Sequence, residues 1–166
     1  MRILGIDPGL YACGYGCLQV SQKGPTLIEA GLIRTKGRID LASRLCHIAD
    51  DLDQILDALY PDVVAIEQLY SHYAHPRTAI LMGHARGVII HRCAARSIRI
   101  LNFNPTRIKK SVTGNGHASK AQIQRAIQTL LRLDQLPRPA DVADAIAAAL
   151  CCADTLRKAT LEAAIT

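Results

Sequence analysis

The 166-residue sequence predicts a single α/β domain in which a mixed β-sheet is covered by helices. Three observations predict this class: strand-like apolar runs open the chain, helical periodicity then alternates with further strand-like runs, and helices fill the last third. Antiparallel strands joined by a hairpin are expected first, followed by parallel strands linked through helical crossovers. Hydrophobic residues make up 49% of the chain and charged residues 20%, a composition typical of a globular protein rather than a disordered one.

The expected elements follow from local spacing and from turn residues. Gly24-Pro25 separates the second strand from the third, and Pro61 ends the first helix, for which Asp40 is available as a cap. Ser119 and Gln122 form a capping-box pattern for a later helix. Strands are expected at 2–7, 14–20, 26–35, 62–68 and 98–103, and helices at about 41–59, at 77–96, from Pro105, after Ser119 and from about Ala140. We expect 1–158 to be one domain and 159–166 a short tail.

The distribution of charge favours a polyanionic partner. Lys and Arg number 20 against 14 Asp and Glu, and several acids gather at 50–57. Between 77 and 132 there is no Asp or Glu, whereas eleven basic residues occur there: Arg77, Arg86, Arg92, Arg96, Arg99, Arg107, Lys109, Lys110, Lys120, Arg125 and Arg132. A stretch of this kind makes nucleic acid the leading candidate partner.

Other classes of protein are disfavoured by what the sequence does not contain. No apolar run approaches about 18 residues, and the chain begins directly in a strand without a secretory leader, so we expect a cytoplasmic protein without membrane contact. The six cysteines form no Cys-x-x-Cys pair, which favours reduced and mostly buried thiols over a zinc site or a disulfide framework. His72 and His75 have no third ligand nearby in sequence, and a polar loop is the better interpretation.

Four carboxylates occupy positions where an isolated charge is unfavourable. Asp7 ends the first strand and Glu67 ends the apolar run of the fourth, while Asp141 and Asp144 lie on one face of an otherwise apolar last helix. If strands one and four are neighbours and the last helix crosses them, all four meet. An oxygen-only ligand set suits Mg²⁺ or Mn²⁺, and two such ions can support phosphodiester hydrolysis. A turn-forming Asp7 and a helix-dipole role for Asp141 are the simpler structural alternatives.

The motifs that carry these residues resemble those of the RuvC-type Holliday-junction resolvases. "ILGIDPGLYACGYG", "AIEQLY", "GHARGV", "VTGNGHASKAQIQ" and "ADVADAIAAAL" match segments of that family in the right order, over about residues 2–155. The resemblance implies a ribonuclease-H-like fold with a five-stranded mixed sheet flanked by helices on both faces. It also implies an Mg²⁺-dependent crossover junction endodeoxyribonuclease that acts in recombination and DNA repair, nicking a four-way junction symmetrically on two strands.

The resemblance assigns roles residue by residue. The family's catalytic and metal-binding carboxylates fall on Asp7, Glu67, Asp141 and Asp144, with two Mg²⁺ ions per active site for which Mn²⁺ can substitute. The family's basic residues near the cut fall on Lys109 and Lys120, of which Lys120 is also expected to assist catalysis, and its aromatic that holds unstacked bases falls on Tyr70. From the basic segment itself, Lys110, Arg77 and Arg107 are further residues expected to contact DNA. The resemblance implies a homodimer and the RuvA–RuvB branch-migration complex as partners. The apolar run "AILMGHARGVII" is too long for one face of a solvated helix, so we expect the dimer to form through the second helix. The histidines after Tyr70 depart from the family's usual polar residues.

Three alternatives remain open at this point. An N-terminal strand followed by Asp-x-Gly also opens actin-like and sugar-kinase ATPases, although these need two such domains and a second phosphate loop. A junction-binding protein without nuclease activity would be expected to lack one of the four carboxylates, and none is lost. A ribonuclease-H-like nuclease acting on another nucleic acid, such as an RNA–DNA hybrid, is the third alternative.

Overall fold

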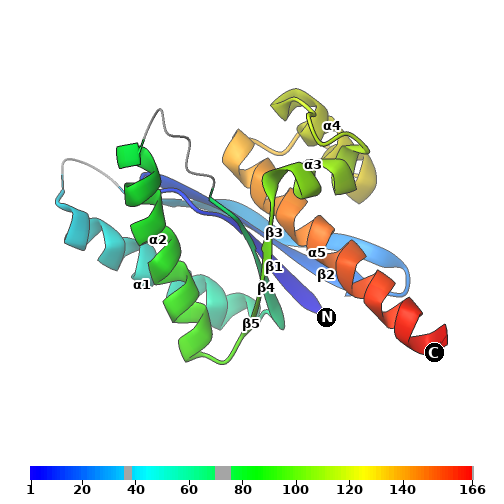
Figure 1. Ribbon diagram of the computed structural model, residues 1–166, viewed down its shortest axis with the longest axis horizontal. Helices are drawn as coiled ribbons and strands as arrows, with labels where there is room; N and C mark the ends of the chain where they lie inside the picture. Colours follow the sequence, from blue (N-terminus) through cyan, green and yellow to red (C-terminus); the bar gives the residue numbers. More distant parts are fainter. Residues whose placement is uncertain (36–38, 70–75, 166) are drawn as a thin grey trace.

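The molecule is built around a five-stranded sheet with helices on both faces (Figure 1). The computed structural model describes residues 1–35, 39–69 and 76–165. The strands are β1 (Arg2–Asp7), β2 (Ala12–Ser21), β3 (Gly24–Arg34), β4 (Val63–Glu67) and β5 (Arg99–Phe103). The helices are α1 (Leu41–Leu59), α2 (Pro76–Ala95), α3 (Pro105–Thr113), α4 (Lys120–Leu131) and α5 (Ala140–Ile165). The elements expected from the sequence are present, with modest differences at their ends.

The sheet is mixed, as the sequence predicts. Its order is β3-β2-β1-β4-β5, in which β1 pairs antiparallel with β2 and parallel with β4, and β4 pairs parallel with β5. The expectation that strands one and four are neighbours is therefore confirmed. Because parallel neighbours end at the same edge, the last residues of β1, β4 and β5 lie together at one edge of the sheet.

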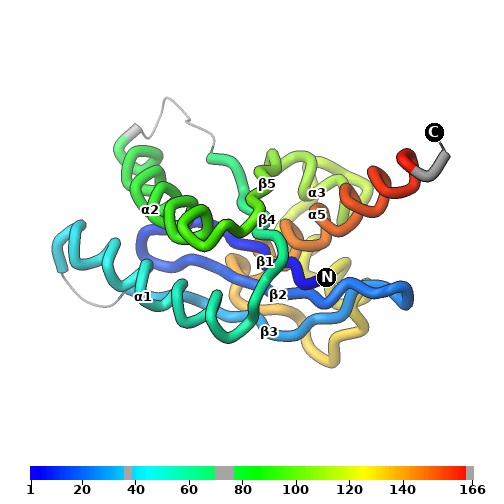
Figure 2. The backbone as a smooth tube through the Cα atoms, turned by 90° about the horizontal axis from the view of Figure 1, so that it is seen from below, coloured from blue at the N-terminus to red at the C-terminus, as the bar shows by residue number. Residues whose placement is uncertain are grey.

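Each face of the sheet has its own core. On one face α5 packs against β1 and β2, with α3 and α4 beside it, around residues such as Ile3, Phe103 and Ile146. On the other face α1 and α2 pack against the sheet around Leu4, Ile66 and Ile89. Figure 2 shows the two layers from below, with α1 and α2 on one side and α3, α4 and α5 toward the other.

Glycines let α5 approach the sheet unusually closely. A Cβ added at Gly5 of β1 would lie 2.0 Å from the carbonyl oxygen of Ala145, and one added at Gly14 of β2 would lie 1.9 Å from that of Asp141. The helix itself presents a run of buried alanines from 147 to 149, which keeps the two surfaces close. The first turns of α5 are thus fixed directly against β1 and β2 at the acidic edge, which is the edge of the sheet that carries Asp7 and Glu67 and at which β1 ends and β2 begins.

The predicted helix caps are formed. Asp40 accepts a hydrogen bond from the backbone N–H of Ser43 at 2.9 Å, and Ser119 and Gln122 make both bonds of a capping box.

Of the six cysteines, five are buried and Cys46 is exposed. Helix α5 continues across residue 158, and the proposed boundary of the domain at that position stays a prediction. None of the helices in the described ranges is long and apolar enough to cross a membrane.

Candidate active site

Asp7 and Glu67 lie side by side because they end two neighbouring strands. Ile6 of β1 is in register with Ile66 of β4, so the next residues, Asp7 and Glu67, end neighbouring parallel strands. Both side chains alternate onto the face that α5 covers, since Gly5 lies against Ala145 of that helix. The backbone of Glu67 is held by pairing with Phe103, and the β4–β5 ladder continues through a bond from the Gln68 N–H to the Phe103 carbonyl oxygen at 2.9 Å.

The start of α5 brings the other two carboxylates to the same edge. Asp141 and Asp144 are both partly buried, and they lie one turn apart at the beginning of the helix. The close contact between Gly14 and the Asp141 backbone fixes this turn beside the Asp7–Gly14 pair of β1 and β2. The hypothesis that a helix crossing strands one and four gathers all four carboxylates is consistent with this arrangement.

The electrostatics of the site are those of crowded acids. Burial, followed by the charges of Glu67, Asp144 and Asp141, raises the pKa of Asp7 from 3.8 to about 8, against the opposing charge of Lys120. Burial and then Asp144 raise the pKa of Glu67 from 4.5 to about 7. The pKa of Asp144 is raised as well, first by burial and then by Asp141. Like charges placed this close are stabilised by a cation between them.

The donor set fits a hard divalent cation. Carboxylate oxygens from β1, β4 and α5 are the ligands that Mg²⁺ and Mn²⁺ prefer, and the mutual repulsion of these groups is relieved when they share a cation. Within the described ranges, no three His, Cys, Asp or Glu side chains form a ready-made ligand set. The mutual shifts in pKa show that Asp7, Glu67 and Asp144 lie within electrostatic reach of one another, and these side chains would have to come closer together to ligate one ion.

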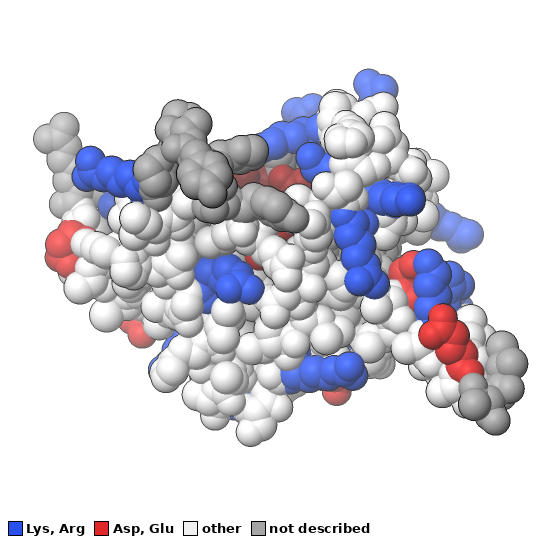
Figure 3. Space-filling view, viewed as in Figure 1, with Lys and Arg blue, Asp and Glu red and all other residues white. Residues whose placement is uncertain are grey.

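Two lysines, one from α3 and one from α4, lie close enough to the carboxylates to affect their ionisation. The charges of Lys109 and Lys120 both oppose the raised pKa of Glu67 and of Asp144. Asn104 caps α3 through a 2.8 Å bond from the Thr106 N–H, and Lys120 opens α4. Figure 3 shows basic side chains gathered over the region of α3 and α4, beside recessed acidic atoms. Lysines next to a group of carboxylates have the chemistry to bind a phosphate group beside divalent cations.

The other residues expected to contact DNA are arranged differently. Lys110 is exposed on α3, and Arg77 is exposed in the first turn of α2, on the other face of the sheet. Arg107 lies over the Phe103 ring, 5.3 Å from its centroid, and donates to Thr155 Oγ1 on α5 at 3.0 Å, so its guanidinium is directed along that helix. Tyr70, His72 and His75 lie outside the described residues.

Part of the basic segment is neutralised, which the sequence does not reveal. Arg92 of α2 and Arg96, the residue after the end of that helix, both pair with Asp53 of α1, the latter at 2.7 Å, and Arg96 also reaches Asp57 at 3.3 Å. Asp53 and Asp57 of α1 thus join that helix to the C-terminal end of α2 through two of the eleven basic residues. The surface left for a polyanion is correspondingly concentrated toward α3 and α4.

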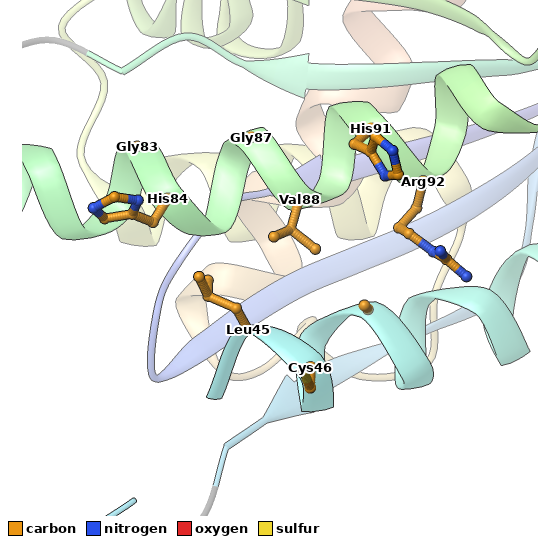
Figure 4. A pocket seen from close by; sticks show the side chains of 9 residues that line it. Leu45, Cys46, Gly83, His84, Gly87, Val88, His91 and Arg92 are labelled. Carbon is orange, nitrogen blue, oxygen red and sulfur yellow. The ribbon is translucent and has the colours of Figure 1, made fainter. Parts of the chain in front are cut away.

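A hollow of about 500 Å³ lies elsewhere, between α1 and α2 (Figure 4). It is mostly apolar and is lined by Leu45, Cys46, Ala49, Gly83, His84, Gly87, Val88, His91 and Arg92. Since α1 and α2 cover the face of the sheet opposite α5, this hollow is separate from the carboxylates. It has the character of a packing surface rather than of a hydrolytic site.

The strand order and the acidic edge define this protein as a member of the ribonuclease-H-like class. The family model described as "Crossover junction endodeoxyribonuclease RuvC" matches residues 3–152. The chain belongs to this family, and the resemblance seen in its motifs is confirmed. Membership decides against the actin-like and sugar-kinase alternative.

Relatives and solved structures agree with this assignment. A protein named "Crossover junction endodeoxyribonuclease RuvC" from Rhodopirellula baltica is 49% identical over 90% of this chain and 84% of its own length. One of the same name from Caldicellulosiruptor saccharolyticus is 43% identical over 91% of each chain. The Thermus thermophilus RuvC structure superposes with a TM-score of 0.87 at 28% identity, covering 96% of this chain and 98% of that one. The structure of a yeast mitochondrial Holliday junction resolvase shares the fold, with a TM-score of 0.66 at 12% identity over 91% of this chain and 77% of its own.

Proposed function

We propose that this chain is a metal-dependent endodeoxyribonuclease that resolves four-way DNA junctions by paired nicks. The observation that carries the proposal is the crowding of Asp7, Glu67 and Asp144 at one sheet edge, within reach of Asp141 and two lysines, in a chain of the RuvC family. Relatives across the family bear a name that states this activity. No equally strong cluster of titratable groups in the described residues suggests a different reaction.

In the proposed site, Asp7, Glu67, Asp141 and Asp144 would hold two Mg²⁺ ions, for which Mn²⁺ could substitute. Ions of this kind supply an activated water and stabilise the leaving oxygen in phosphodiester hydrolysis. The chain's own contribution is to keep the carboxylates on rigid strand and helix ends, so that the ligands need little reorganisation. Their raised pKa values mean that binding of the metal is accompanied by release of protons near neutral pH.

The basic side chains serve the phosphate backbone. Lys120 is proposed to stabilise the charge that develops on the phosphate that is cut, and Lys109 to hold that phosphate or its neighbour. Lys110, Arg77 and Arg107 extend the contact to more distant phosphates. The role of Tyr70 at the crossover, as a ring that holds an unstacked base, also stays a prediction.

A homodimer provides the second active site that two symmetric cuts require. Ile80 on the outer side of α2 is 63% exposed, and a Cβ added at Gly83 or Gly87 would meet no atom within 4 Å. An apolar, side-chain-poor helix face beside the α1–α2 hollow suits close packing of a second copy. The RuvA–RuvB complex as a further partner and a cytoplasmic location remain expectations from the sequence.

Cleavage of an immobile four-way junction, assayed beside an RNA–DNA hybrid of the same sequence, tests the proposed function. With Mg²⁺ present we expect paired nicks at symmetric positions in two junction strands and little cutting of the hybrid. Preferred cutting of the hybrid would favour the alternative of a nuclease for another substrate. Tight junction binding without any cutting, in Mg²⁺ or Mn²⁺, would favour a binding protein instead.

A further inference from the structure

An exposed aromatic ring lies in the loop that follows Asp7 at the acidic edge. Tyr11 lies in the connection between β1 and β2, four residues after Asp7, and is 67% exposed. Its ring therefore contributes little to the hydrophobic core, although the preceding Leu10 is buried. An aromatic side chain left largely in water beside a proposed nuclease site suggests a ligand that covers it.

The ring is held in place from beneath. The Arg44 guanidinium lies over one face of Tyr11, 4.5 Å from the ring centroid, and Arg44 is only 6% exposed. Arg44 in turn donates to both the carbonyl and the hydroxyl oxygen of buried Thr35. Burying a guanidinium is unfavourable unless it is well bonded, so this arrangement fixes Arg44 and with it the ring.

The backbone around the tyrosine is bonded to the same residue. The Thr35 N–H donates to the Tyr11 carbonyl oxygen at 3.2 Å, and the Thr35 hydroxyl donates to the Leu10 carbonyl oxygen at 3.0 Å. The loop and the ring thus share one buried support, formed by Thr35 just after β3 and by Arg44 in the first turn of α1. A preorganised ring with one face covered by a cation has its remaining exposed surface ready for a second flat partner.

Tyr11 and the lysines lie on different sides of the carboxylates. The support of Tyr11 comes from α1, on the α1–α2 face of the sheet, whereas Lys109 and Lys120 belong to α3 and α4 on the α5 face. Asp7 pairs with Gly14 across β1 and β2, which keeps the loop that bears Tyr11 at the acidic edge. A DNA strand lying over the carboxylates therefore has phosphate-binding lysines on one side and an aromatic ring on the other.

We propose that Tyr11 is a stacking platform that holds an unpaired base next to the phosphate that is cut. The proposal rests on the proposed junction-resolving function and adds a residue that determines how the strand is positioned. Stacking of a base on the open ring face, with Arg44 on the other face, gives a guanidinium–tyrosine–base sandwich. Stacking is tolerant of base identity, so Tyr11 positions the strand rather than selecting a sequence.

Fluorescence of 2-aminopurine, placed at successive positions around the crossover, locates the stacked base. In Ca²⁺, which should allow binding with little cutting, we expect one position to be quenched by the wild-type protein and by Tyr11→Phe, but brighter with Tyr11→Ala. In Mg²⁺, Tyr11→Ala should lower the second-order rate of junction cleavage by about 5- to 150-fold, the effect of losing one base–aromatic stack. Tyr11→Phe should stay close to wild type.

A junction with an abasic nucleotide at the quenched position provides the decisive comparison. On that junction, wild type and Tyr11→Ala should cut at the same rate, because the stack is absent in both. Tyr60→Ala is the matched control, since Tyr60 is 73% exposed at the far end of α1 and should change neither signal. A thermal melt checks that each variant is folded.

Three outcomes separate failure of this inference from failure of the proposed function. If the wild type cuts junctions but Tyr11→Ala cuts them equally fast with unchanged fluorescence, Tyr11 is not a stacking platform and the proposed function stands. The same conclusion follows if Tyr11→Ala cuts the abasic junction more slowly than the wild type does, by the same factor as on the intact junction. If the wild type cuts no junction, the proposed function itself fails.

Discussion

At the level of single residues, the four carboxylates are proposed to act in catalysis, although crowding them together lowers the free energy of unfolding. Asp7→Asn or Asp144→Asn keeps the side-chain volume but removes a negative ligand, so cutting of junctions in Mg²⁺ should be abolished. Junction binding should persist, because Lys109 and Lys120 are untouched. Single-turnover cleavage and a gel-shift assay in Ca²⁺ measure the two properties.

The control for these variants is Asp134→Asn, which makes the same change in charge at an exposed position between α4 and α5. It should cut and bind like the wild type. Substantial Mg²⁺-dependent cleavage by Asp7→Asn or by Asp144→Asn would remove the proposed assignment of metal ligands.

The raised pKa values predict how the metal-free protein responds to pH. Between about pH 4 and pH 8 the unfolded chain releases protons that folded Asp7 and Glu67 retain, since their pKa values rise to about 8 and about 7. The unfolded state then binds fewer protons than the folded state, so these groups lower the free energy of unfolding as pH increases through this window. Above about pH 8 their destabilising effect is fully developed.

Asp7→Asn should therefore be more stable than the wild type in EDTA at about pH 8.5, and the difference should shrink toward about pH 4. A relief of 1 kcal/mol or more corresponds to an increase in Tm of at least about 2 °C for a chain of this size. Thermal melts across the pH range measure it. Added Mg²⁺ at the higher pH should raise the Tm of the wild type more than that of the variant. A difference in Tm between Asp7→Asn and the wild type that does not vary with pH would contradict the view that ionisation of buried Asp7 destabilises the fold.

At the level of elements, the contact of α5 with the sheet positions half of the site. Gly14→Ala would place a methyl group 1.9 Å from the Asp141 carbonyl oxygen, so the helix must move away from β2. We expect a loss of about 1–3 kcal/mol in the free energy of unfolding and a marked fall in cleavage, because Asp141 and Asp144 move with the helix. Thermal melts and single-turnover cleavage test this.

Gln19→Ala, farther along the same strand and partly exposed, serves as the control and should affect both measurements little. If Gly14→Ala unfolds at the wild-type temperature and cuts at the wild-type rate, the close approach of α5 does not govern the site.

How much of this arrangement the sequence predicts depends on the range of the contacts. Asp7 and Glu67 end strongly apolar strands, so their pairing follows from local pattern and one assumption about strand order, which the sheet confirms. The sequence does not identify the glycines at 5 and 14 as the contact points of α5, because only the packed helix reveals why a side chain is excluded there. Local pattern identifies elements and strand ends, but it contains no information on such contacts.

Ion pairs between residues far apart in the chain are also not predicted by the sequence. Arg92 and Asp53 are separated by 39 positions, and in the sequence they are parts of a basic and an acidic segment. In the fold they neutralise each other between α1 and α2. The support of Tyr11 by Arg44 is equally invisible in sequence, because a loop and a helix some way along the chain meet only through packing.

At the level of the whole molecule, two symmetric cuts require two sites held in a fixed relation. Helix α2 lies on the sheet face opposite α5, so a second copy docked on it through Ile80, Gly83 and Gly87 would leave both acidic edges free. Ile80, Gly83 and Gly87 follow the three- and four-residue spacing of one helix face, and the hollow beside them is mostly apolar. These features define the α2 face as the proposed dimer interface.

Ile80→Asp tests this interface. A charge buried at the centre of a packed contact typically weakens association by at least about 30-fold, whereas the same change at a free surface leaves the fold intact. We therefore expect the wild type to sediment as a dimer at micromolar concentration and Ile80→Asp as a folded monomer that gives single nicks rather than paired ones. Ile28→Asp on β3, at a residue that is 44% exposed, should remain dimeric and give paired nicks. A wild type that sediments as a monomer, or an Ile80→Asp protein that remains a dimer, would place the second active site against some other surface of the chain.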